Sequence, residues 1–181
     1  AAQCRPNSMR VHAIYGPPGT GKTTELLQRV KNARESGVQA ERVAFVSFTR
    51  AAANEALSRL GLKRSSNVST IHAMAFRHMG LQQSQVVDPA KLREFSTVMG
   101  IPIIGKSPED DEERSDGAFY LDIINYARNT FTDPAEVYDV SDRPGTRAEF
   151  NVFTRAYAEW KHTYGYYDFT DMLERAAKGA V

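Results

Sequence analysis

The stretch GPPGTGKT at residues 16–23 constrains this chain more than any other part of its sequence. It satisfies the pattern G-x-x-x-x-G-K-[ST], whose glycines let backbone N–H groups curve around a phosphate. A β-prone run precedes it at 11–15, and apolar residues at helical spacing follow it as far as Gly37, a predicted helix cap. Because that helix would direct its positive end at the same anion, this order predicts a phosphate-binding loop, or P-loop.

The loop residues have separate predicted roles. We expect Lys22 to neutralise the β- and γ-phosphates and the Thr23 hydroxyl to bind Mg²⁺, so these two are also the predicted catalytic residues. A structural glycine turn without a ligand is the alternative. The predicted nucleotide-binding set is Gly16, Pro17, Pro18, Gly19, Thr20, Gly21, Lys22, Thr23 and Thr24.

Strand and helix patterns alternate after the loop. Residues 42–48 are nearly all apolar and β-branched or aromatic, which is typical of a parallel strand covered on both faces. A helical pattern follows at 51–61, a third strand candidate lies at 67–71, and the next eight or so residues favour a helix. This alternation predicts an α/β domain with a parallel sheet.

Beyond residue 81 the sequence favours helices, which are predicted near 90–99, 119–128 and 147–164. The acidic segment 107–117 is predicted to be a solvated linker. We interpret this region as a mostly helical insertion. An aromatic stripe at helical spacing is predicted to be a core face rather than a platform for stacked bases, and it consists of Phe150, Phe153, Tyr157 and Trp160.

The composition excludes several classes of protein. The 181 residues are 41% hydrophobic and 25% charged, as in soluble globular proteins. No apolar run approaches the roughly 20 residues of a membrane span, and the one cysteine, Cys4, excludes an internal disulfide. We therefore expect a cytoplasmic protein with no membrane segment. Residues 1–8 show no periodicity and are interpreted as a cloning remnant, with Met9 as the natural start.

Charge is divided unevenly along the chain. Residues 1–80 hold 12 Lys and Arg against 4 Asp and Glu, whereas residues 81–181 hold 11 against 18. The basic half contains the P-loop, which favours an anionic partner such as a nucleic acid. A solvated basic face that merely balances an acidic one is the alternative.

Three further stretches carry motifs. FTRAAANE at 48–55 is similar to the pattern F-T-x-x-A-A-x-E-M, and Thr70 and His72 match a T-x-H motif. YYDFTDML at 166–173 is similar to a D-F-D-D-L stretch. With the P-loop, these motifs resemble, in order, those of the UvrD/Rep-type superfamily 1 DNA helicases, where the first of the three is called motif Ia.

The resemblance implies a fold and a set of DNA contacts. The expected fold is an incomplete P-loop NTPase (RecA-like) parallel sheet, with residues 9–84 and 151–181 in the first motor domain and 85–150 in a helical insertion. Motif Ia would lie at the carboxyl end of a strand, where ligands gather. The implied DNA-binding residues are Phe48, Thr49, Arg50, Thr70 and His72, with a core position as the alternative for Phe48. Asp168 and Asp171 are spaced like a helix N-cap and its partner, and we prefer this interpretation to catalysis.

The function implied is an ATP-dependent helicase that moves on single-stranded DNA, with ATP and Mg²⁺ as cofactors and the rest of a helicase chain as a partner. No Asp-Glu motif after a strand is found, so we expect residues 1–181 alone to bind nucleotide with little turnover. If 11–15 were a strand with open edges, self-association would follow. The alternatives are a complete small P-loop phosphotransferase and a non-catalytic nucleic-acid-binding module.

Overall fold

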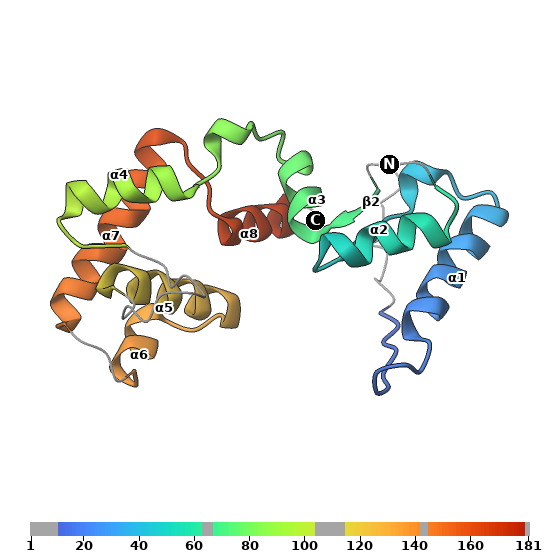
Figure 1. Cartoon of the computed structure of the whole chain (residues 1–181), viewed down its shortest axis with the longest axis horizontal. Helices are drawn as coiled ribbons and strands as arrows, with labels where there is room; N and C mark the ends of the chain where they lie inside the picture. Colours follow the sequence, from blue (N-terminus) through green and yellow to red (C-terminus); the bar gives the residue numbers. More distant parts are fainter. Residues whose placement is uncertain (1–10, 63–66, 104–114, 142–144, 180–181) are drawn as a thin grey trace, which may run out of the picture. The chain divides into compact units, whose positions relative to one another are not determined.

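The computed structural model describes residues 11–62, 67–103, 115–141 and 145–179 (Figure 1). Residues 1–8 and most of the acidic segment 107–117 therefore lie outside the described residues. The chain forms two compact units, Ala1–Ile71 and His72–Val181. In the part of the chain that is described, no helix combines the length and the apolar character needed to cross a membrane.

The first unit contains a two-stranded parallel sheet and two helices that pack on each other. Strands β1 and β2 pair with Phe45 opposite Val68 and Ser47 opposite Thr70. The core is small and aliphatic, and it joins both helices to the sheet through Leu27, Ala56, Leu57, Leu60 and Val68. The elements are α1 (Lys22–Glu35), a 3₁₀ turn η1 (Ala40–Arg42), β1 (Phe45–Ser47), α2 (Arg50–Arg59) and β2 (Val68–Thr70).

Local sequence explains where these helices end. Gly37 has a φ of 84°, and its N–H donates to the carbonyl of Arg34, which satisfies one of the last carbonyls of α1. Gly61 does the same for α2, with a φ of 64° and a bond to Ser58. The predicted cap at Gly37 is confirmed, and the helical pattern predicted at 51–61 ends at a glycine of the same conformation.

The predicted strand at 11–15 is wrong. These residues form no strand, and the side chains of Val11 and Tyr15 are 82% and 89% exposed. A strand needs a neighbour for its backbone groups, and within the described residues β1 and β2 pair only with each other. The structure therefore confirms parallel pairing but in a smaller sheet, and the described residues are mostly helical. The strand edge on which predicted self-association depended does not form.

The second unit is helical. Its elements are α3 (Ile71–His78), which follows β2 directly, a 3₁₀ turn η2 (Gln83–Gln85), α4 (Pro89–Met99), α5 (Asp116–Thr130), α6 (Pro134–Asp139), α7 (Arg147–Tyr164) and α8 (Phe169–Gly179). The short helix α6 was not predicted. Asp133 caps it by accepting from the N–H of Ala135, and Pro134 occupies its first position.

Helix α7 carries the larger core. It begins at a capping box between Thr146 and Glu149 and ends at Gly165, whose φ is 65°. Its predicted aromatic stripe is confirmed as a core face, because Phe150 and Phe153 are fully buried. Burial of each such ring contributes about 1.5–3 kcal/mol. The rings of α7 pack against others from α4, α5 and α6, namely Phe95, Tyr120 and Tyr138.

A second cluster in this unit joins α3 to α8, which lie side by side (Figure 1). Ala75 of α3 and Met172 of α8 are buried together with Val86. The backbone adds two hydrogen bonds, because Tyr167 donates to the carbonyl of Gln85 and accepts from the N–H of Val87. The turn before α8 is therefore fixed beside the segment that follows α3.

Candidate functional site

The P-loop lies at the amino end of α1, as the sequence predicts. Gly19 and Gly21 have φ values of 83° and 80°, in the region that favours glycine, and Gly21 is the N-cap of α1. At position 16 the absence of a side chain makes room for Thr20, because a Cβ added there would lie only 2.7 Å from the Thr20 hydroxyl oxygen. The loop thus has turns that depend on glycine, and glycine turns of this kind let backbone N–H groups approach a phosphate.

Lys22 is the first residue of α1, and its side chain folds back over the loop. Its Nζ donates to the carbonyl oxygens of Gly16 and Pro17, each at 2.6 Å. The Thr20 hydroxyl donates to the same Pro17 carbonyl at 2.9 Å. The ammonium group is therefore held over the half of the loop that precedes the helix.

The loop borders a cavity of about 260 Å³. It is lined by Gly19, Thr20, Gly21, Lys22, Thr23 and Thr24 and by two residues of α2, Glu55 and Arg59. These two form an ion pair with an N–O distance of 2.5 Å, and each is about half exposed. Motif Ia contains Glu55, but sequence reasoning did not place this helix beside the loop, because nothing local indicates which faces of α1 and α2 meet.

The motif Ia residues and Thr70 lie at one end of the sheet. Phe48, Thr49 and Arg50 follow the last residue of β1, and Thr70 ends β2, whose register pairs it with Ser47. Thr49 caps α2 by accepting from the N–H of Ala52. The structure therefore brings four of the five predicted DNA-contact residues to the carboxyl ends of the two strands.

Phe48 is exposed. Its side chain is 89% accessible, so it is not a core residue, although the run before it is apolar. Strand β1 ends at Ser47, and Phe48 falls in the bend before α2. An exposed aromatic ring beside Arg50, which is also exposed, is a suitable surface for a stacked base and its phosphate.

The fifth predicted residue, His72, lies in the second unit at the start of α3. Its ring meets that of Phe169 edge-on, with centroids 5.1 Å apart and planes inclined by 68°. Phe169 is the first residue of α8 and is 60% exposed. Phe169 lies inside the D-F-x-D-L-like stretch but was not predicted as a site residue, because only the two carboxylates of that stretch have a spacing that indicates a role.

Those carboxylates cap α8, which confirms the capping prediction. The N–H of Asp171 donates to the Asp168 carboxylate at 2.8 Å, and the N–H of Asp168 donates to the Asp171 carboxylate at 2.9 Å. The structure adds two cations that were not predicted. Lys161 of α7 donates to both carboxylates at 2.5 and 2.6 Å, and Arg128 of α5 also reaches both.

The environment of this cluster shifts the pKa values of several of its groups, Tyr157 and Asp171 among them. Burial raises the pKa of the Tyr157 phenol, and the charges of Asp168 and Asp171 raise it further. Burial acts to raise the pKa of the Asp171 carboxyl as well, but the hydrogen bond from Lys161 and nearby positive charge outweigh it, so that pKa lies below its ordinary value. Asp171 is therefore ionised at neutral pH and serves as a fixed acceptor rather than as a proton donor.

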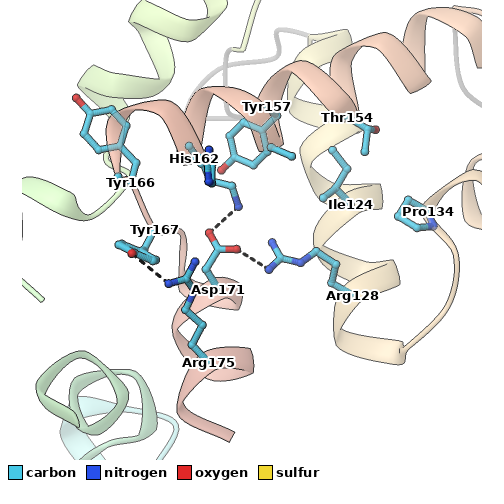
Figure 2. A pocket seen from close by; sticks show the side chains of 13 residues that line it. Ile124, Arg128, Pro134, Thr154, Tyr157, His162, Tyr166, Tyr167, Asp171 and Arg175 are labelled. Carbon is cyan, nitrogen blue, oxygen red and sulfur yellow. Dashed lines mark hydrogen bonds and ion pairs between the residues drawn. The ribbon is translucent and has the colours of Figure 1, made fainter. Parts of the chain in front are cut away.

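The cluster forms one wall of a cavity of about 490 Å³ between α5, α7 and α8. Figure 2 shows Arg128 and Asp171 pointing toward one another, and Arg175 bonded to the hydroxyl of Tyr167. Both capping carboxylates, Asp168 and Asp171, are already bonded to a cation, which indicates that the cluster is a structural network. Across the described ranges no group of three His, Cys, Asp or Glu side chains is placed to hold a metal ion.

Comparison with known proteins bears on what this arrangement is for. No curated protein matches the chain in a sequence search. The family model described as the UvrD/REP helicase N-terminal domain matches residues 2–179, which is essentially the whole chain. Membership of one family thus explains the P-loop, the motif residues at the sheet end and their order. The chain belongs to the UvrD/REP helicase N-terminal domain family.

Proposed function

We propose that this chain is the ATP-binding part of a superfamily 1 DNA helicase that moves along single-stranded DNA. The P-loop carries the proposal, because its glycines have the required backbone conformation and Lys22 stands at the start of α1. Family membership supports it, since this domain belongs to ATP-dependent helicases. In this proposal residues 9–84 and 151–181 belong to the motor domain and 85–150 form its insertion.

The residues of the loop fit a triphosphate with Mg²⁺. The N–H groups at the amino end of α1 and the Lys22 ammonium would bind the phosphates, and the Thr23 hydroxyl would bind the metal ion. The bordering cavity of about 260 Å³ admits phosphate groups, and Thr23 and Thr24 line it. When bound, the nucleotide supplies the hydrolysable phosphoanhydride bond, and the loop holds and neutralises it.

We infer two patches for single-stranded DNA. One is the sheet end with Phe48, Thr49, Arg50 and Thr70 in the first unit. The other is the ring pair of His72 and Phe169 in the second unit, and the exposure of Phe169 supports its addition to the predicted set. Aromatic rings stack on any base, so such contacts are independent of sequence, as a translocating motor requires.

Isothermal titration with Mg-ATP tests the nucleotide site. Lys22→Ala removes charge-assisted hydrogen bonds worth about 1.5–3 kcal/mol, so we expect affinity to fall roughly tenfold or more. Lys31→Ala, at an exposed position further along α1, removes the same charge and is the control. Equal affinities of the wild type and Lys22→Ala would contradict the site. Transfer of phosphate to a small metabolite would favour a phosphotransferase instead.

A further inference from the structure

We propose that Arg128 is a positioning residue that holds Phe169 in place for DNA through the first turns of α8. The inference rests on the proposed DNA contact of Phe169. It assigns a role to the insertion helix α5, which the motif pattern leaves without one. The geometry around the start of α8 carries the proposal.

Arg128 contacts three acidic residues on one side of α8. Its Nε and Nη2 donate to the two oxygens of Glu174, both at 2.9 Å. Nη2 also donates to Asp171 at 2.7 Å, and Nη1 reaches Asp168 at 3.2 Å. A planar guanidinium can satisfy several carboxylates at once in this way, whereas an ammonium group cannot reproduce the fork.

Helix α5 holds the chain on both sides of Phe169. Asp168, just before it, accepts from Arg128, and Thr170, just after it, donates to the side chain of Asn125 at 3.2 Å. Both neighbours are buried, at 9% and 7% exposure, while Phe169 itself is 60% exposed. An exposed ring between two buried, α5-bonded neighbours has its backbone fixed and only its side chain available.

The charge balance explains why Arg128 can be removed without loss of the cap. Three carboxylates face two cations, Arg128 and Lys161. Without Arg128, Lys161 still bridges Asp168 and Asp171 from α7, so the capping box of α8 persists. Of the hydrogen bonds to α5 described here, only the Asn125 contact then remains, so the first turn of α8 loses its charged anchor on the side of α5 while its contacts with α7 and α3 persist.

A double-mutant cycle between Arg128 and Phe169 tests this role. Affinity for labelled oligothymidine is measured by fluorescence anisotropy for the wild type, Arg128→Gln, Phe169→Ala and the double variant. We expect Arg128→Gln to raise Kd about threefold or more when Phe169 is present, and less than about twofold in the Phe169→Ala background. Arg147→Gln is the control, because it removes the same charge from an exposed pair with Asp139.

The affinity of the Glu174→Gln variant for oligothymidine is a second test, and it does not require the Arg128→Gln variant to fold. Loss of an acidic charge alone strengthens DNA binding, whereas loss of the Arg128 anchor weakens it, so the two explanations predict opposite signs. We expect weaker binding. Stronger binding in Glu174→Gln, or equal effects of Arg128→Gln with and without Phe169, would overturn the positioning role. If Phe169→Ala alone leaves affinity unchanged, the proposed DNA contact fails and this inference fails with it.

Discussion

Ser47 and Thr70 are partners in the parallel ladder of the first unit, so the residues that follow β1 and the end of β2 meet at one end of the sheet. This pairing joins two motifs, at 48–55 and 70–72, that are separated in the chain by 14 residues. It places the ring of Phe48 and the side chain of Arg50 just beyond the end of β1, where both are exposed.

Arg50→Ala is expected to weaken binding of oligothymidine and to reduce its salt dependence. Each phosphate contact contributes about −0.7 to the slope of log affinity against log salt for a single strand, so the slope should become shallower by about that amount. Arg42→Ala is the control, because Arg42 precedes β1 at the opposite end of the strand. Anisotropy titrations at several salt concentrations measure both quantities. An unchanged slope in Arg50→Ala would remove Arg50 from the contact surface.

His72→Ala is expected to weaken single-strand binding several-fold, because it removes one ring of the proposed contact pair. The fold should persist, because His72 packs against the edge of Phe169 rather than in the core. Ring contacts of this kind contribute about 0.5–1.5 kcal/mol. His78→Ala, near the end of the same helix α3 and exposed, is the matched variant. Identical affinities for the two variants would show that the ring pair has no part in binding.

Lys161→Met is expected to destabilise the protein strongly. Lys161 is 7% exposed and lies between two carboxylates, and removal of one partner from a buried ion pair costs about 3–5 kcal/mol. Lys178→Met, at an exposed position on α8, should cost less than about 0.5 kcal/mol. Urea denaturation gives both values. Equal midpoints for the two variants would mean that the network adds nothing to stability.

Stability should also fall in acid because of Asp171. Its pKa is lowered in the folded protein, so its contribution is complete above the unfolded value of about 3.9 and is lost as pH falls through the lower folded value. In Asp171→Asn this contribution is absent at every pH. The difference in unfolding free energy between wild type and Asp171→Asn should therefore be large at pH 7 and shrink below about pH 4. A difference that grows in acid would reverse the assignment.

Gly21→Ala should weaken nucleotide binding by more than its loss of folding stability can explain. Gly21 and Gly37 have φ values of 80° and 84° at the two ends of α1, so alanine at either position costs a similar amount of about 1 kcal/mol. Only Gly21 belongs to the loop. Thermal melts should show similar losses for the two variants, and titration with Mg-ATP should show weaker binding for Gly21→Ala alone. Parallel losses of affinity would assign the effect to stability.

The sequence predicted elements whose signals are local. The bounds of α7 were predicted as 147–164 and are found at Arg147–Tyr164, because a capping box and a glycine mark its two ends. The α8 cap was likewise readable from the spacing of Asp168 and Asp171. In contrast, the strand at 11–15 was predicted from its own residues, although a strand depends on a partner that local sequence does not identify.

The remainder of the site depends on contacts between distant residues. Arg128 meets Asp168 across 40 positions, and the sequence around Arg128 contains no motif that predicts this. For Phe48, the apolar run before it left a core position as the alternative to DNA contact, and its exposure excludes the core position because the strand ends one residue earlier. Residue type predicted the chemistry of these side chains, and tertiary packing decided which of them are exposed.

The position of Lys22 has a consequence for anion selection. Its ammonium already has two carbonyl acceptors, so one of its three N–H donors is left for an incoming anion. Chloride carries one charge and, as a single atom, accepts little more than that one donor. A polyphosphate brings several charges and many acceptor oxygens, and it can also engage the N–H groups at the start of α1. We therefore expect the loop to bind polyphosphates in preference to monovalent ions.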